Sequence, residues 1–443
     1  MVIKDLSKEA VVKSIKEHLQ YVETKRTVER YKMLNYYEGL VSELEADINK
    51  WFNADSLKQA PPVVTNLTGK MVDSRAISYK QAPQRMADER YEEIAWNLDS
   101  RMLQLERLTY LLGTMGLKTF YNEEKQRIEY DLLVEFYPMF LPNSSEPVAV
   151  AYPLFSHGNS KMQEQVYVFW SAEEHYNITQ RGKIISVNDE DVNPYGVMPI
   201  TFAHRHPLTT DWWREGASDI VSVNTTVNIL LTEMSLGMRL EMLGQPWVSG
   251  IDDASRMQLG VDKPLILPEG ASFQFATAGG NLTQYSDAIR FMIDKVAYEN
   301  SLKTKWAVGR DAISGEALKM LEVDLTEAVM TDVEMVWRDF ERTRYEVDRA
   351  VLDYHNVSLN EEYSVDFSEP RFPLSATEER AQWEWEWQHG LRSKKDWFRK
   401  NNPDSTDVDA LVENVQAERA QETTAEQPAT EGNLLLQALQ QPV

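Results

Sequence analysis

Hydrophobic residues recur every three or four positions along most of this chain, a spacing that places them on one face of an α-helix. The pattern predicts helices over residues 6–50, 63–79, 90–126, 213–243, 281–303 and 315–355, and two shorter ones after Ser375 and Ser393. The segment 213–243 is the most regular, because its apolar positions keep helical spacing for about five turns. Those positions are Ile220, Val223, Val227, Leu230, Met234 and Met238.

Between residues 128 and 206 the period changes. Short runs of β-branched and aromatic residues are bounded by Pro, Asn, Ser and Gly, which is typical of strands. Short strands and loops are also expected at 245–280, where Phe273 and Phe275 share a face, and one strand is expected near residue 365. The fold class is therefore predicted to be α+β, mostly α. Residues 415–443 are rich in Gln, Glu, Ala and Thr with little periodicity, and are predicted to be a disordered tail.

Charge and composition narrow the class of protein. The 443 residues include 46 Lys and Arg against 70 Asp and Glu, for a formal net charge of −24. Tight nucleic-acid binding works by replacing counterions with basic side chains, so a DNA partner would be guided or repelled rather than gripped. The chain has no Cys, which excludes disulfides and thiolate chemistry and fits assembly in a reducing cytoplasm. No apolar run reaches the roughly 20 residues of a membrane span, and none is expected.

Motifs for catalysis or cofactor binding are missing from the sequence. There is no GxGxxG after a strand, no GxxxxGK[ST] and no GxSxG. His204 and His206 would share one face of a strand, but nothing places His157, His175 or a carboxylate beside them as a third ligand. A polar strand edge is favoured over a metal site. No catalytic residue, cofactor or metal is predicted.

The run WEWEWQH at 383–389 allows two interpretations. Trp beside Glu384 and Glu386 is a combination found in glycoside hydrolases, where aromatic rings stack on sugars and two carboxylates act as acid and base. In a helix, however, Trp383 and Trp387 share a face and the two Glu lie elsewhere on it. A packed aromatic stripe is therefore the favoured interpretation.

The order of the predicted elements suggests a stalk with a head. Two long helices, 213–243 and 281–303, leave and return around a small β-containing module. A polar break with the basic residues Lys303, Lys305 and Arg310 follows, and then a helix of about 60 Å begins near Gly315. Taken alone, the basic residues are explained as helix C-terminal charges that complement the helix dipole.

Five local patterns in this order resemble the portal proteins of tailed bacteriophages, in the branch with a short single-chain subunit. The patterns are YKMLNYYEGL with APPVVTNLTGKMVDSRAISYKQAPQR, NPYGVMPITFAHR, REGASDIVSVNTTVNILLTEM, SGEALKMLEVDL, and RFPLSATEERAQWEWEWQHGLRSKKDWFRKNNPD. Each is weak alone, whereas five in family order over residues 31 to about 405 are fairly specific. The compact module at 245–280 and the short, polar C-terminus depart from the family pattern.

The resemblance implies an architecture for this chain. Residues 1–210 and 315–375 would form the wing, 211–244 and 281–303 the two stem helices, 245–280 the clip, 304–314 the tunnel loop and 376–414 a reduced helical crown. The channel residues it implies are Lys303, Lys305, Arg310, Asp311 and Ser314, with Gly309 and Gly315 as loop hinges. The clip residues it implies are Trp247, Asp252, Asp253, Lys263 and Phe273.

The resemblance also implies a function and partners. Such subunits form a ring, typically of twelve copies, at one capsid vertex, through which double-stranded DNA enters and leaves. Expected partners are the terminase large subunit, a head-completion adaptor or tail proteins, and the major capsid and scaffolding proteins. The expected location is the virion, after assembly in the host cytoplasm. Two alternatives stay open: an acidic glycoside hydrolase using Glu384 and Glu386, and a tail or baseplate scaffold without a channel.

Overall fold

The computed structural model describes most of the chain up to residue 401. The described residues are 1–21, 23–59, 61–154, 165–188, 190–243, 245–250, 267, 269–276, 282–303, 315–368, 376–401 and 415. The chain divides into two compact units, one of residues 1–311 with 321–370 and the other of 312–320 with 371–443. Helices and strands are both present and helix predominates, so the predicted α+β class is confirmed.

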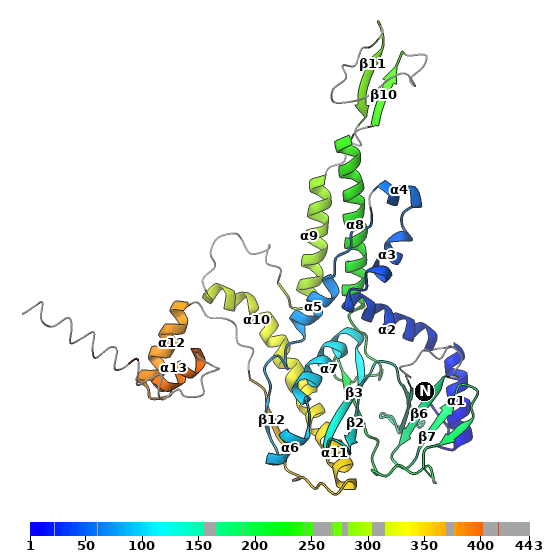
Figure 1. Cartoon of the computed structure of the whole chain (residues 1–443), viewed down its shortest axis with the longest axis vertical. Coiled ribbons are helices and arrows are strands. Elements are labelled where there is room, and N and C mark those ends of the chain that lie inside the picture. The colour runs from blue at the N-terminus through cyan, green and yellow to red at the C-terminus, as the bar shows by residue number, and fades with distance from the viewer. Residues whose placement is uncertain are drawn as a thin grey trace, which may run out of the picture. The chain divides into compact units, whose positions relative to one another are not determined.

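Five helices open the first unit (Figure 1), and all but α4 lie where helices were predicted. They are α1 (Lys8–Tyr21), α2 (Glu23–Glu38), α3 (Val41–Asn49), α4 (Ala54–Gln59) and α5 (Leu67–Arg75). Asn66 caps α5, because its side-chain oxygen accepts a hydrogen bond from the Gly69 amide at 2.8 Å. Two more helices follow, α6 (Glu89–Ile94) and α7 (Leu98–Leu112).

The helix predicted over 90–126 is wrong in its last third. The chain leaves α7 at Gly113 (φ 83°), a conformation that favours glycine, and a Cβ there would lie 2.0 Å from the Arg214 carbonyl oxygen. Residues Thr114–Asn122 then form strand β2, the middle strand of a sheet ordered β3-β2-β9. The first part of β2 is buried on both faces, so its sequence lacks the alternation that would have marked a strand.

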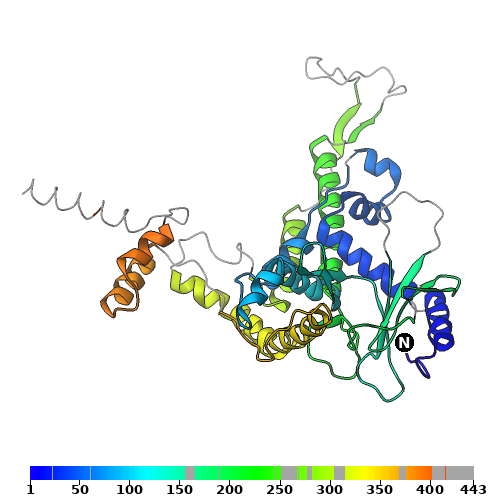
Figure 2. The same ribbon diagram turned by 60° about the horizontal axis from the view of Figure 1, so that its bottom comes forward.

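Two antiparallel sheets make up the β-rich region, which is confirmed. In the three-stranded sheet, β3 (Arg127–Leu133) and β9 (Ile200–His204) flank β2. The second sheet is ordered β4-β5-β6-β7-β8, with strands β4 (Tyr137–Met139), β5 (Ala149–Pro153), β6 (Val166–Ser171), β7 (His175–Thr179) and β8 (Ile184–Ser186). Helix α1 covers one face of this sheet, where Val11 and Ile15 pack with Phe169 and Tyr176 (Figure 2).

The long helix predicted from Gly315 is present, with a change of winding in its middle. It consists of α10 (Gly315–Asp332), a π-helical turn (Val333–Trp337) and α11 (Arg338–Tyr354). The Arg338 amide donates to the carbonyl of Val333, five residues back, as a π turn requires. Helix α11 packs against β2 and β9, and the two-stranded sheet of β1 (Gln84–Met86) and β12 (Ser364–Asp366) lies beside it.

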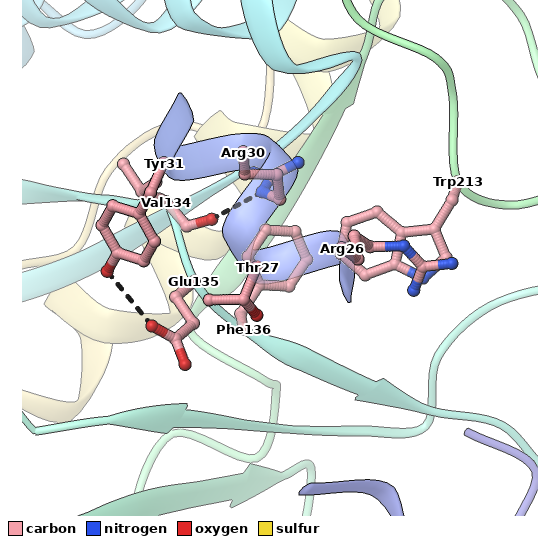
Figure 3. Close-up of a pocket in the computed structure, with 8 residues that line it drawn as sticks. All are labelled: Arg26, Thr27, Arg30, Tyr31, Val134, Glu135, Phe136 and Trp213. Carbon is pink, nitrogen blue, oxygen red and sulfur yellow. Dashed lines mark hydrogen bonds between the residues drawn. The ribbon is translucent and has the colours of Figure 1, made fainter. Parts of the chain in front are cut away.

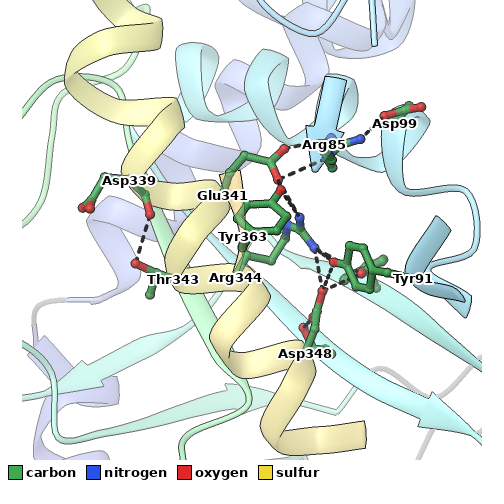
Figure 4. A network of polar contacts seen from close by, with 11 residues as sticks. Arg85, Tyr91, Asp99, Asp339, Glu341, Thr343, Arg344, Asp348 and Tyr363 are labelled. Carbon is green, nitrogen blue, oxygen red and sulfur yellow. Dashed lines mark hydrogen bonds and ion pairs between the residues drawn. The ribbon is translucent and has the colours of Figure 1, made fainter. Parts of the chain in front are cut away.

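A fully buried ionic network fixes α11 in place (Figure 4). The Arg344 guanidinium lies 2.5 Å from a carboxylate oxygen of Glu341 and 2.5 Å from one of Asp348, and all three side chains have no exposed surface. Arg85 on β1 pairs with Glu341 at 2.8 Å. The same oxygen of Asp348 accepts hydrogen bonds from the hydroxyl groups of Tyr91 and Tyr130, and its other oxygen accepts one from Thr119. Charges taken out of water need such partners to be tolerated.

The second unit contains two described helices, α12 (Ala376–Gln388) and α13 (Lys394–Asn401). The predicted helix start at Ser393 is confirmed, because Ser393 and Asp396 each accept a hydrogen bond from the other's amide as in a capping box. Trp383 packs edge-on against Trp397 with ring centroids 5.1 Å apart. Trp385 and Trp387 are both 54% exposed, so the prediction that Trp387 is part of a packed stripe is wrong.

Candidate functional site

The feature that sets this fold apart is a two-helix stalk that rises from the first unit. It is formed by α8 (Ser218–Leu243) and α9 (Leu282–Glu299), and its far end continues into the antiparallel hairpin of β10 (Gln245–Ser249) and β11 (Ser272–Ala276) (Figure 1). With 26 residues, α8 is about 39 Å long. Both helices and the strands between them were predicted.

The stalk helices pack through a face that differs from the predicted one. On α8 the buried positions are Ile220, Val221, Asn224, Val227, Asn228 and Thr232. Val223 and Leu230 are partly buried against the core, while Met238 near the far end is 38% exposed. The predicted stripe of Ile220, Val223, Val227, Leu230, Met234 and Met238 is therefore right at the base and wrong at Met238. Three buried polar positions, four residues apart, take the place of apolar ones.

Those polar positions hold the extended segment 61–66 against α8. The side-chain oxygen of Asn224 accepts from the amides of Leu67 and Thr68, both at 3.0 Å, and its amide group donates to the Thr65 carbonyl at 2.9 Å. One turn further, Asn228 accepts from the Thr65 amide at 2.9 Å, and Thr232 accepts from the Val63 amide at 3.0 Å. Buried backbone groups that lack a strand partner are satisfied in this way.

Two exposed aromatic side chains lie on the outer face of α9. Ile289, Ile293, Val296 and Ala297 are buried on the inner face. On the opposite side Phe291 is 69% exposed and Tyr298 is 75% exposed. Because the two rings are seven residues apart they lie on one line along the helix. Large apolar groups aligned on an exposed helix face are a feature of interaction surfaces.

At the base of the stalk, one asparagine joins both stalk helices to the body. Asn300 follows the last turn of α9, and its side-chain oxygen accepts hydrogen bonds from Tyr110 on α7 and from Arg205 after β9. Its amide group donates to Asp219 in the first turn of α8 at 2.9 Å. The Arg205 guanidinium also lies over the Tyr110 ring, 4.1 Å from its centroid.

A second set of charged groups adjoins Tyr110 at the end of α10. Arg75 Nη1 lies 2.8 Å from Asp332 Oδ2, with 8% and 18% of the two side chains exposed. Burial raises the pKa of Asp332, against the opposing effect of Arg75. Glu106 accepts from the amides of Ser78 and Tyr79 at 2.8 and 3.1 Å, and burial raises its pKa to about 7. A cavity of about 10 Å³, the size of one water molecule, lies among these side chains. We call Arg75, Glu106, Tyr110, Arg205 and Asp332 the stalk-base cluster.

A second small cavity lies beside α2 and has no room for a ligand (Figure 3). Its volume is about 10 Å³, and Arg26, Arg30, Glu135, Phe136 and Trp213 are among its lining residues. Arg30 is buried and donates to the carbonyl groups of Leu112, Thr114 and Val134. The guanidinium of Arg26 lies 4.6 Å from the centroid of Trp213. These contacts join α2 to the sheet and are structural.

The channel residues implied by the resemblance lie largely outside the described part of the chain. Lys303 is described, and its Nζ lies 3.1 Å from Asp324 Oδ2 on α10. Gly315 is the first residue of α10. The others, Lys305, Gly309, Arg310, Asp311 and Ser314, fall outside the described residues.

Of the clip residues implied by the resemblance, two are among the described residues and three are not. Trp247 on β10 is 51% exposed, and Phe273 on β11 pairs in register with Val248. Asp252, Asp253 and Lys263 lie outside the described residues.

The histidines weighed as metal ligands make local contacts instead. His204 ends β9, where its Nδ1 lies 3.2 Å from Thr114 Oγ1 and burial lowers its pKa to about 4. His175 stacks on Trp170, and His157 lies outside the described residues. Within the described ranges no three His, Asp or Glu side chains gather as metal ligands, and no helix has the length and apolarity to cross a membrane.

The two carboxylates of the glycoside hydrolase interpretation are not arranged as a pair. Glu384 and Glu386 are two residues apart on α12, so their side chains leave the helix about 200° apart. Glu386 Oε2 lies 2.9 Å from Arg392 Nε, and Glu386 Oε1 accepts from Gln382 at 2.9 Å. Glu386 is therefore engaged by two neighbours of its own unit, as an ion-pair partner and as a hydrogen-bond acceptor.

Comparisons with known proteins give structural matches only. No family model and no curated protein matches the chain. It is similar to a chain in the neck of an empty gene transfer agent particle computed with C6 symmetry, with 11% identity, 78% and 93% of the two chains covered, and a TM-score of 0.42. A chain of the native particle's virion matches with 11% identity, 78% and 92% coverage and a TM-score of 0.41. A chain of the native particle's neck computed with C12 symmetry matches with 11% identity, 74% and 87% coverage and a TM-score of 0.40. At these values no functional conclusion rests on the likeness.

Proposed function

We propose that this chain is a portal subunit, which forms a ring at one vertex of the capsid of a tailed phage or phage-like particle and passes double-stranded DNA through its centre. The observation that carries the proposal is the stalk. Helices α8 and α9 leave and return to one body around a small hairpin, in a chain whose motifs follow the order of that family.

The exposed face of α9 supports assembly from copies of one chain. Two packed helices bury the faces that meet each other and leave their outer faces exposed. Here the outer face of α9 carries Phe291 and Tyr298. When stalks stand side by side in a ring-shaped assembly, the next copy of the chain covers these two aromatic side chains. Closed symmetry is the common form of assemblies of identical subunits. In this proposal α8 and α9 are the stem, β10 and β11 belong to the clip, α12 and α13 to a reduced crown, and the rest of the first unit to the wing.

The charge of the chain suits a conduit. Twelve copies at −24 would carry about −288 charges before counterions, a field that discourages DNA from sticking to the wall. Weak contacts to phosphates are assigned to residues 304–314, with Lys305 and Arg310 as the cations and Asp311, Ser314 and the glycines 309 and 315 shaping the loop. Lys303, whose Nζ lies 3.1 Å from Asp324 Oδ2, is assigned to the same set of cations.

The proposed partners follow from the same assignment. The terminase large subunit would dock at the clip, where Trp247 is exposed and Asp252, Asp253, Lys263 and Phe273 lie nearby in the chain. A head-completion adaptor or tail protein and the capsid and scaffolding proteins would contact the wing and crown. We assign this chain no enzymatic step, and ATP hydrolysis belongs to the motor protein.

Negative-stain electron microscopy of the purified chain tests the proposal. We expect class averages of rings with rotational symmetry and an axial hole wide enough for duplex DNA. Particles of monomer size over a broad range of concentration and salt would contradict the proposal. Rings or layers without an axial hole would favour the tail or baseplate scaffold.

A pair of variants locates the contact between copies. Phe291→Asp places a charge in the middle of the exposed α9 face, and we expect it to shift the population from rings to monomers. Val28→Asp, at a residue on α2 that is 60% exposed, introduces the same charge away from the stalk and should leave the rings intact. Equal ring loss in both variants would remove α9 as the specific contact.

A further inference from the structure

The two halves of the long helix are anchored very unequally. Helix α11 holds the buried Arg344 network, and Phe340, Tyr345, Val351 and Leu352 are buried beside it. Among the described side chains of α10 only Val329 is buried. Two ion pairs add to its anchoring, Asp324 with Lys303 and Asp332 with Arg75. A rotation within the helix would therefore be taken up by α10.

The π turn lies at the joint between these halves. An α-helix advances 100° per residue, so Val329, Val333 and Trp337, each four apart, would drift around the axis by 40° per step. All three are buried in the structure. The wider π turn corrects the drift and keeps them on one side, at the cost of a less favoured winding. Trp337 is held there by edge contacts with Tyr79 and Phe340.

We infer that this π turn is a register switch, and that the Asp332–Arg75 ion pair is the latch that holds α10 in the register seen here. Rewinding residues 333–337 as α-helix rotates α10 by about 100° relative to α11, the angle of one residue. Asp332 then leaves Arg75, and Val329 leaves the core. Because α10 directly follows residues 304–314, the rotation changes the direction in which that segment enters the helix.

The latch is suited to release because it is incompletely enclosed. Asp332 is 18% exposed on its side chain and makes one described ion pair, whereas the carboxylates of the Arg344 network are fully buried. The water-sized cavity of the stalk-base cluster adjoins both Arg75 and Asp332, which leaves room for their side chains to move. Through Tyr110, whose ring lies under Arg75 and whose hydroxyl donates to Asn300, the latch also contacts the base of the stalk.

Spin-label distances in the full chain test the switch. The chain has no Cys, so Glu327→Cys on α10 and Glu346→Cys on α11 give one labelled pair at two exposed sites. Mixing labelled chains with an excess of unlabelled chains removes distances between copies. We expect one narrow distance distribution in this background, and nearly the same distance after deletion of Met335, an exposed residue of the π turn, because one residue fewer lets this segment wind as α-helix without rotating α10. A large change of distance in the deletion variant would overturn the inference, because the π turn would then not be the one-residue excess that sets the register.

The latch itself is tested by Asp332→Asn and, from the other side, by Arg75→Gln. In each we expect a second distance, from chains in which α10 is rotated on α11, to rise from below detection to on the order of a tenth of the molecules or more. Asp339→Asn makes the same charge change seven residues further along the helix, at an exposed position, and should leave the single distance unchanged. If both latch variants keep the single distance, the ion pair is not a latch and the inference fails. These distances are measured within one chain, so their outcome is separate from ring formation.

Discussion

Two arginine sites on the long helix satisfy the same kind of charge in different ways. Arg344 is enclosed by Glu341, Asp348 and the hydroxyl groups of three tyrosines, with no exposed surface on the three charged side chains. Arg75 meets Asp332 alone, in a partly exposed pair beside a water-sized cavity. The first site joins α11 to strands β1, β2 and β3, whereas the second joins the end of α10 to α5.

The difference teaches where this fold is rigid and where it can move. A buried charge that loses its partner is left without water or a counterion, so a complete network resists any displacement. A single ion pair loses fewer contacts when it opens, and here the adjoining water-sized cavity gives the separated side chains room to move. The structure therefore places the rigid anchor on the body side of the π turn and the releasable contact on the side toward residues 304–314.

The largest expected effect tests the rigid site. Arg344→Gln leaves Asp348 buried without a cation, and we expect a loss of about 3–5 kcal/mol in the free energy of unfolding. Arg349→Gln on the same helix is the control, because its partner Glu361 is 86% exposed and the loss should stay within about 1 kcal/mol. Urea unfolding followed by circular dichroism measures both. Similar losses in the two variants would show that the buried network is not the anchor.

A pH effect is expected from the stalk-base cluster. The pKa of Glu106 is about 7 in the folded chain against 4.5 as its ordinary value, so the folded chain holds the proton more tightly. Stability from this group is complete below pH 4.5 and falls as pH rises through 7, by about 3 kcal/mol in all. Glu106→Gln imitates the protonated form, so it should match the original chain at pH 5 and exceed its stability at pH 8.

The control for this change is Glu92→Gln at an exposed position on α6. It removes one carboxylate in the same way and should leave the dependence of unfolding on pH unchanged. Denaturant unfolding of the three chains at pH 5 and pH 8 provides the comparison. Parallel pH curves for Glu106→Gln and the original chain would mean that Glu106 stays ionised in the fold.

The smallest expected loss of stability comes from a threonine on the stalk helix α8, and a second threonine on the same helix serves as its control. Thr232 and Thr226 each donate to the carbonyl four residues back, but Thr232 is buried and also accepts from the Val63 amide. Thr232→Ala should cost about 1–2 kcal/mol, because a partly buried amide loses its acceptor. Thr226→Ala should change stability by no more than about 0.5 kcal/mol. Equal effects would show that the hydrogen bond from Val63 does not contribute.

Much of the fold was predictable from local pattern. The stalk helices, the β-rich region, the hairpin strands and the long helix each carry a period or a turn signal that survives in isolation. Strand β2 did not, because it is buried on both faces and follows a helix without a polar break. Residues 114–122 form a strand because Gly113 ends α7 and because β3 and β9 pair with it. Both of those strands come later in the chain.

The candidate site was predictable only in outline. Asn224, Asn228 and Thr232 were a signal in the sequence, since polar residues four apart on an otherwise apolar helix indicate a partner that needs hydrogen bonds. Their partner, the segment 61–66, lies about 160 residues away and could not be inferred from spacing. The ion pair between Lys303 and Asp324 could not be inferred from spacing either.

The sequence by itself determined the class of fold, the stalk, the acidic balance and the absence of thiol chemistry, because these depend on composition and on periods of a few residues. Tertiary structure alone decided which polar groups meet. The Arg344 network, the stalk-base cluster and the π turn all join residues from separate elements, and their burial sets the energy of each contact. A helical pattern predicts that residues 315–355 are wound as one helix, whereas only packing against the body decides that the winding changes at Val333.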